Sequence, residues 1–123
     1  MLLESLATTT HTSVKVNILN LIGALALTTA RQAVLQYATD DPEAEVRLHA
    51  VLALESIATI DDLPMLRERL ADARPEVQAV TIGALASLFK RTGAEQSIPP
   101  MIWKVAVEAE DERVQLAAIQ AML

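Results

Sequence analysis

The chain has 123 residues, 52% of them hydrophobic, and a formal net charge of -6 at pH 7. This length and apolar content are those of an ordinary globular domain and exclude a disordered chain. The absence of cysteine excludes disulfides and thiolate metal sites, and the acidic balance disfavours nucleic acid and anionic membranes and mildly favours a basic partner.

The first residues, MLLESLATTTHTS, lack the basic and long apolar segments of a signal peptide. Apolar runs such as residues 20–27 are shorter than the roughly 20 residues that a membrane span requires. Aromatic residues make up only 2% of the chain, so its core must be built from Ala, Leu, Val and Ile. We therefore expect a soluble, cytoplasmic protein made of closely packed helices.

An apolar pattern recurs four times and predicts four equivalent helices. The pattern begins at Val14, Val46, Val77 and Val114, and apolar or small residues return at its first, fifth, sixth and ninth places. Such spacing is typical of a helix that buries one stripe. The offsets between the valines are 32, 31 and 37 residues, within the range of helical repeat proteins.

Shorter helices are predicted before each of these segments, at residues 30–37, 62–70 and 100–107, with residues 1–6 as the remnant of a first one. The sequence thus predicts an all-α chain of about four helix pairs, the first truncated, in a single domain. The expected repeat units are approximately residues 1–27, 28–59, 60–91 and 92–123.

The repeated turn and helix resemble the HEAT-repeat family, in particular the short bacterial repeats named after phycobilisome lyase subunits. The resemblance rests on Asp41-x4-Val46-Arg47-x2-Ala50-x3-Leu54, on Asp72-x4-Val77-Gln78, and more weakly on Ile22-Gly23. It implies paired antiparallel helices stacked into a right-handed α-α superhelix, with the second helix of each pair on the concave side.

A polar residue follows each of the four valines, in the middle of the apolar arc: Lys15, Arg47, Gln78 and Gln115. Gln78 and Gln115 stand where the family has Arg, while Thr9 and Ala109 stand where it has the loop Asp. A long side chain there can pass over the end of the core, so Arg47 is expected to meet a loop carboxylate, that of Asp41 or Asp72. We interpret Asp41, Arg47 and Asp72 as structural, with ligand binding as the alternative.

The opposite face of the long helices is small and nearly uncharged. Its residues are Asn17, Asn20, His49, Leu52, Ser56, Val80, Gly83 and Ser87. Because a solvated helix face usually carries Lys and Glu, this strip predicts a groove for an extended peptide or a helix, unless curvature of the stack covers it. For Gly83, close approach of a neighbouring helix is favoured over ligand access.

Catalytic and metal-binding patterns are not recognised. His11 and His49 are the two histidines, and the acidic group at residues 108–112 is interpreted as a solvated helix start because the glycine-containing EF-hand pattern is absent. The basic residues between 67 and 91 are interleaved with acids, so no nucleic-acid surface is expected. The chain is therefore expected to be no enzyme and to take no cofactor or metal.

The sequence favours a scaffold that binds a protein or peptide on the concave face. The alternative, implied by the family resemblance, is an accessory HEAT-repeat subunit of an enzyme, such as a bilin lyase or a phycobilisome-degradation protein. Neither end of the repeat pattern shows the polar cap that solenoids need, which predicts a longer array or a homo-oligomer formed through the ends.

Overall fold

The computed structural model describes residues 11–93 and 98–122, so the helix expected at residues 1–6 lies outside the described part. The chain divides into two compact units at the junction between Ile57 and Ala58, and each unit is treated by itself below. Within the described ranges, none of the helices combines the length and hydropathy that crossing a bilayer requires.

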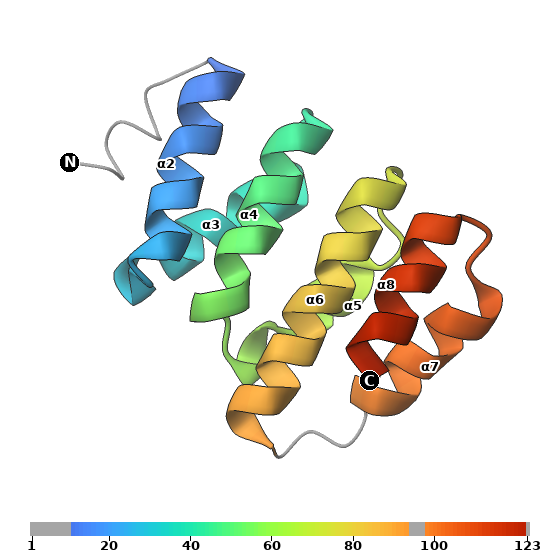
Figure 1. Cartoon of the computed structure of the whole chain (residues 1–123). Coiled ribbons are helices and arrows are strands. Elements are labelled where there is room, and N and C mark those ends of the chain that lie inside the picture. The colour runs from blue at the N-terminus through green and yellow to red at the C-terminus, as the bar shows by residue number, and fades with distance from the viewer. Residues whose placement is uncertain (1–10, 94–97, 123) are drawn as a thin grey trace. The chain divides into compact units, whose positions relative to one another are not determined.

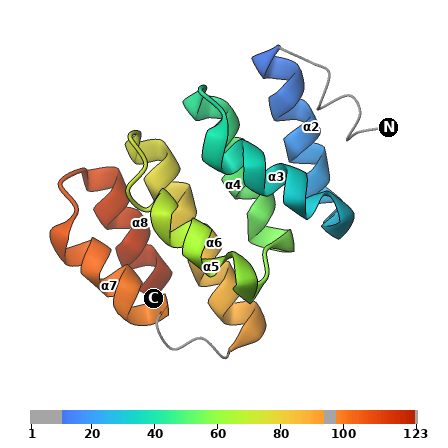
Figure 2. The ribbon, with the colours of Figure 1, turned by 180° about the vertical axis from the view of Figure 1, so that it is seen from behind.

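Unit 1 consists of α2 (Thr12–Ala24), the short 3-10 turn η1 (Thr28–Ala30), α3 (Arg31–Asp40) and α4 (Ala44–Ile57). Helix α4 packs against both α2 and α3. In Figure 1 α2 and α4 lie side by side with α3 behind them, and Figure 2 shows α3 from its own side. The pair formed by α3 and α4 is the helix pair that the sequence predicts within residues 28–59.

The core of unit 1 comes from the predicted apolar stripe. Leu19 and Ile22 of α2 and Val46 and Leu54 of α4 are completely buried, as is Val34 of α3. The expectation that Val14 is equivalent to Val46 is wrong, because Val14 keeps 40% of its surface exposed. Each helix therefore occupies the predicted register, but the first place of α2 is not a core position.

Close contact between α2 and α4 depends on Gly23. A Cβ atom on Gly23 would lie 2.9 Å from the Cα atom of Ala53, closer than real side chains come to a backbone. The absence of a side chain therefore lets the two helices approach, and this packing offsets the cost of about 1 kcal/mol that glycine imposes on a helix relative to alanine.

Unit 2 consists of the 3-10 turn η2 (Ile60–Asp62), α5 (Leu63–Arg69), α6 (Pro75–Thr92), α7 (Ile98–Glu108) and α8 (Glu112–Met122). Helix α6 packs against α8, while α5 packs on α6 and α7 packs on α8. Figure 1 shows α6 and α8 side by side, and Figure 2 shows α5 in front of α6. Helix α6 ends at Thr92 and is followed by Gly93 in the left-handed conformation (φ 63°), as is common after the last residue of a helix.

The predicted stripe of α6 is buried at all four places, including Thr81, whose hydroxyl donates a hydrogen bond of 2.7 Å to the carbonyl oxygen of Val77. On α8 the prediction is half right. Val114 and Ala118 are buried, whereas Ile119 and Met122 keep 47% and 40% of their surfaces exposed. The corresponding places of α6 are covered within unit 2 because α8 packs beside that helix. One face of α8 is thus apolar and uncovered.

Substituting Gly23 by Ala tests the close approach of α2 and α4. Helix propensity alone predicts a gain in stability, but the added Cβ must push the backbone of Ala53 away, so we expect a net loss of about 1–3 kcal/mol in the free energy of unfolding. Urea denaturation of the full chain measures this change. Asn17→Ala, at an exposed place on the same helix, is the control and should change stability by less than about 0.5 kcal/mol. A more stable Gly23→Ala variant would contradict the close packing.

Candidate interaction surfaces

The unit 1 part of the predicted strip forms one surface across α2 and α4, which we call the α2/α4 face. It consists of Asn17, Asn20, His49, Leu52 and Ser56, without a charged residue among them. The two asparagines and Ser56 are exposed, while His49 and Leu52 are half-buried. On α4 the three residues are spaced by three and four positions and therefore share one side of the helix.

Hydrogen bonds between the two helices hold the polar groups of this face in place. His49 Nδ1 lies 2.8 Å from Asn20 Oδ1, and the hydroxyl of Ser56 donates to the carbonyl oxygen of Gly23 at 3.0 Å. The ring of His49 and the amide of Asn20 therefore hold each other in position across the two helices. The remaining polar atoms of both side chains can meet the N–H and C=O groups of a bound main chain.

The unit 2 part of the predicted strip, Val80, Gly83 and Ser87, lies on α6, and all three residues are half-buried. Their spacing of three and four also places them on one side of the helix. The close approach of a neighbouring helix at Gly83 stays a prediction. A single groove that includes residues of both units also stays a prediction.

The residues interpreted as structural, Asp41, Arg47 and Asp72, take part in two matching turns. Asp41 accepts the N–H of Glu43 at 2.9 Å through its carboxylate, and its carbonyl oxygen accepts a bond of 2.9 Å from Arg47 Nη1. Asp72 accepts the N–H of Arg74 at 3.0 Å, and its carbonyl oxygen accepts a bond of 2.6 Å from Gln78 Nε2. Each aspartate therefore shapes the turn that leads into α4 or α6.

The second carboxylate oxygen of each buried aspartate faces a cation. Lys15 Nζ lies 3.0 Å from Asp41 Oδ2, and Arg69 Nη1 lies 3.5 Å from Asp72 Oδ2, with each aspartate side chain at most 3% exposed. The loop partner expected for Arg47 is found at the main-chain oxygen of Asp41, while Lys15 reaches the carboxylate. These contacts compensate the burial of the two charges and support the structural interpretation.

In the turn before α8, an aspartate lies closer to the helix start. Asp111 directly precedes α8 and accepts the N–H of Arg113 at 2.8 Å, and its carboxylate also binds the guanidinium of Arg113 at 3.1 Å. Arg113 also reaches Glu76 of α6 at 2.8 Å. The acidic group before α8 thus includes a helix cap, and no group of three metal-ligating side chains is found in the described ranges.

Arg113 is one cause of the altered titration of both acids. Its side-chain and backbone hydrogen bonds hold the pKa of Asp111 below the usual value for aspartate. The pKa of Glu76 is lowered by a hydrogen bond from its own backbone N–H and further by Arg113. Because both pKa values are lower in the folded state than in the unfolded state, ionised Glu76 and Asp111 stabilise the fold above about pH 5, and this contribution is lost as the pH falls.

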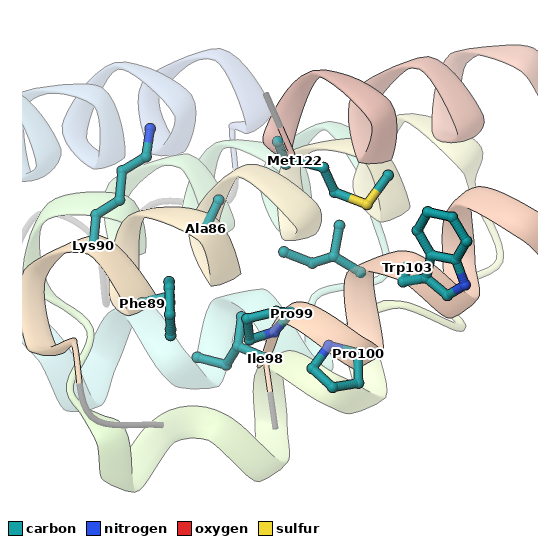
Figure 3. A pocket seen from close by; sticks show the side chains of 10 residues that line it. Ala86, Phe89, Lys90, Ile98, Pro99, Pro100, Trp103 and Met122 are labelled. Carbon is teal, nitrogen blue, oxygen red and sulfur yellow. The ribbon is translucent and has the colours of Figure 1, made fainter. Parts of the chain in front are cut away.

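A cavity of about 510 Å³ lies in unit 2 between the end of α6, the start of α7 and the end of α8, and we call it the unit 2 cavity. Figure 3 shows the side chains that line it, among them Phe89, Lys90, Pro99, Pro100, Trp103 and Met122. Sequence reasoning missed this site. Phe89 and Trp103 were visible only as rare aromatic residues, and no spacing rule joins residues of three helices.

Repeated helix pairs with an aspartate turn define an α-helical repeat protein. The chain belongs to the HEAT-repeat family, because the family model described as HEAT repeats matches residues 1–86 of its sequence. The chain is also similar to a solved structure, the complex of CpcE and CpcF of phycocyanin lyase from Nostoc sp. PCC7120. That match has a TM-score of 0.87 and 17% sequence identity, and it covers 99% of this chain and 78% of the other.

At this level of identity the structural match speaks for the fold. It confirms the predicted all-α, HEAT-type solenoid fold and the family resemblance noted in the sequence. No curated protein matches the chain.

Substituting Arg113 by Gln tests the cause of the altered titration. Without the guanidinium, we expect the pKa values of Asp111 and Glu76 to rise toward their usual values, and stability to depend less on pH below about pH 5. Carboxyl-carbon NMR titration measures both pKa values. Lys104→Gln, which removes a cation without a bonding partner among the described residues, is the control. Unchanged values in Arg113→Gln would show that backbone hydrogen bonds alone lower the two pKa values.

Proposed function

We propose that this chain is a protein-interaction scaffold that binds a peptide or a helical segment of another protein on the faces of its second helices. The α2/α4 face carries the proposal, because its exposed side chains are uncharged and its polar groups are held by the bonds between Asn20 and His49 and between Ser56 and Gly23. The matching residues on α6 belong to the same proposal.

The chemistry of this face suits a bound main chain. A peptide segment needs hydrogen-bond donors and acceptors for its N–H and C=O groups as well as an apolar contact for its side chains. Asn20 and His49 supply polar groups for the main chain, and Leu52 lies one turn from His49 on the same side of α4. Fixed polar groups also reduce the entropy that binding costs.

The HEAT-repeat family assignment supports the same role, since stacked helix pairs provide extended surfaces for binding other molecules. The proposal includes that the chain itself catalyses no reaction, takes no cofactor and works in the cytoplasm.

Substituting Leu52 by Glu tests the α2/α4 face. Random peptides displayed on phage and selected on the wild-type chain should bind Leu52→Glu at least about tenfold more weakly, because the new carboxylate must lose its hydration in the complex. Gln36→Glu, which adds the same charge at an exposed place on α3, is the control and should bind normally. Circular dichroism establishes that both variants fold. Equal binding by a folded Leu52→Glu variant would remove the α2/α4 face as the binding surface.

The structural match favours a second candidate, an accessory subunit of a bilin lyase or a related enzyme that holds a chromophore-bearing protein. The observation in its favour is the TM-score of 0.87 to a chain in the complex of CpcE and CpcF of phycocyanin lyase. Because that structure is a complex of CpcE and CpcF, this second candidate would act together with a partner subunit.

Absorbance spectroscopy tests the second candidate. If the chain holds a bilin or a bilin-bearing protein, mixing the two should shift or sharpen the visible absorption band, because a bound tetrapyrrole is held in fewer conformations than a free one. A spectrum equal to the sum of the separate components, recorded with the chain in excess, would count against the accessory-subunit role and leave the scaffold role untouched.

A further inference from the structure

The unit 2 cavity combines exposed apolar side chains with a lysine. Trp103 and Met122 keep 61% and 40% of their surfaces exposed and line the cavity with the half-buried Phe89. Lys90 lies beside Phe89 on the α6 side of the cavity (Figure 3), and no other described residue bonds to it. Exposed aromatic surface of this kind is typical of binding sites.

The walls of the cavity are formed before a ligand arrives. Pro99 and Pro100 lie in the first turn of α7, where proline fixes the backbone and contributes no N–H donor, so this wall is rigid and apolar. Trp103 offers a large contact area with only two side-chain torsions to immobilise. Ligand binding at such a site costs little conformational entropy.

The charge at the cavity differs from that of the whole chain. Acidic residues outnumber basic ones by 16 to 10 overall, whereas none of the described residues that line the cavity is acidic. Lys90 and Arg91 close the last turn of α6, and Arg91 donates to the carbonyl oxygen of Ala58 at 2.9 Å, whereas Lys90 is the charged residue among the described ones that line the cavity. The net charge indicates a basic partner, whereas this cavity suits an anionic group beside an apolar one.

We infer that the unit 2 cavity binds an acidic amphipathic helix of another protein, with two apolar side chains in the cavity and a carboxylate at Lys90. The volume of about 510 Å³ lies within the range of about 300–1,000 Å³ for sites that bury a drug-sized group, and so exceeds the needs of one side chain. A helix presents two such anchors one turn apart. This inference rests on the proposed protein-binding role but concerns another surface than the α2/α4 face.

Fluorescence of Trp103 tests the inference directly, because it is the only tryptophan in the chain. The probe is an alanine-based helical peptide with two leucines one turn apart and glutamates beside them, and a matched peptide carries lysine in place of each glutamate. The glutamate peptide should shift the emission of the full chain to shorter wavelength, and the lysine peptide should bind at least about tenfold more weakly.

Charge reversal at the cavity provides the matched variants. Lys90→Glu should invert the preference between the two peptides, while Gln36→Glu, with the same added charge in unit 1, should keep it. Met122→Glu should abolish binding of both peptides. Circular dichroism establishes that each variant folds. Because Lys90 is exposed, Lys90→Glu should fold normally, and its peptide preference tests the inference even if Met122→Glu does not fold.

Unchanged emission with both peptides, or an unchanged preference in Lys90→Glu, would overturn the inference. Emission that shifts with protein concentration alone, together with light scattering of a dimer, would assign the cavity to a second copy of the chain and also overturn it.

The two proposals fail separately. Phage-selected peptides that depend on Leu52, together with glutamate peptides that ignore Lys90, would leave the scaffold role in place and overturn this inference. Binding of the glutamate peptide that depends on Lys90 but not on Leu52 would support the cavity and leave the α2/α4 face without its proposed role.

Discussion

Two buried aspartates determine how the helices of this chain begin. Asp41 and Asp72 each bind the N–H two residues ahead, and the main-chain oxygen of each receives a side chain from six residues ahead. A buried carboxylate is costly unless it is fully bonded, so each turn is held in the one conformation that satisfies it. The direction in which α4 and α6 leave these turns, and hence the side chains they expose, follows from those bonds.

The same bonds explain a departure from the family pattern. Arg47 and Gln78 differ in charge, but each donates a hydrogen bond to the carbonyl oxygen of the aspartate that precedes its helix. At this carbonyl the requirement is for an N–H donor on a long side chain rather than for a positive charge. Cations serve the carboxylates instead, Lys15 for Asp41 and Arg69 for Asp72.

Periodicity in the sequence predicted the fold well, because a buried stripe is a local property of each helix. It placed Val46 and Val77 in the core and gave the helix pairs in the correct order. It was wrong about Val14, Ile119 and Met122, since burial also requires a neighbour, and the repeat pattern does not say which faces have one. The helical spacing placed Asn20 and His49 on the face opposite the core, but the hydrogen bond between them depends on how closely α2 and α4 approach. The unit 2 cavity was beyond prediction, because its wall joins residues of three helices.

The aspartate turn has one more consequence, for the way such a chain can lengthen in evolution. Apart from the contact of Lys15, the bonds described for each of Asp41 and Asp72 are made within a stretch of ten residues or fewer, so each segment contains the residues that form its own turn. If the segment were duplicated or deleted, the hydrogen bonds that hold its turn would be gained or lost with it. The remaining copies would keep their own. Gene duplication can therefore change the number of modules without redesigning any of them.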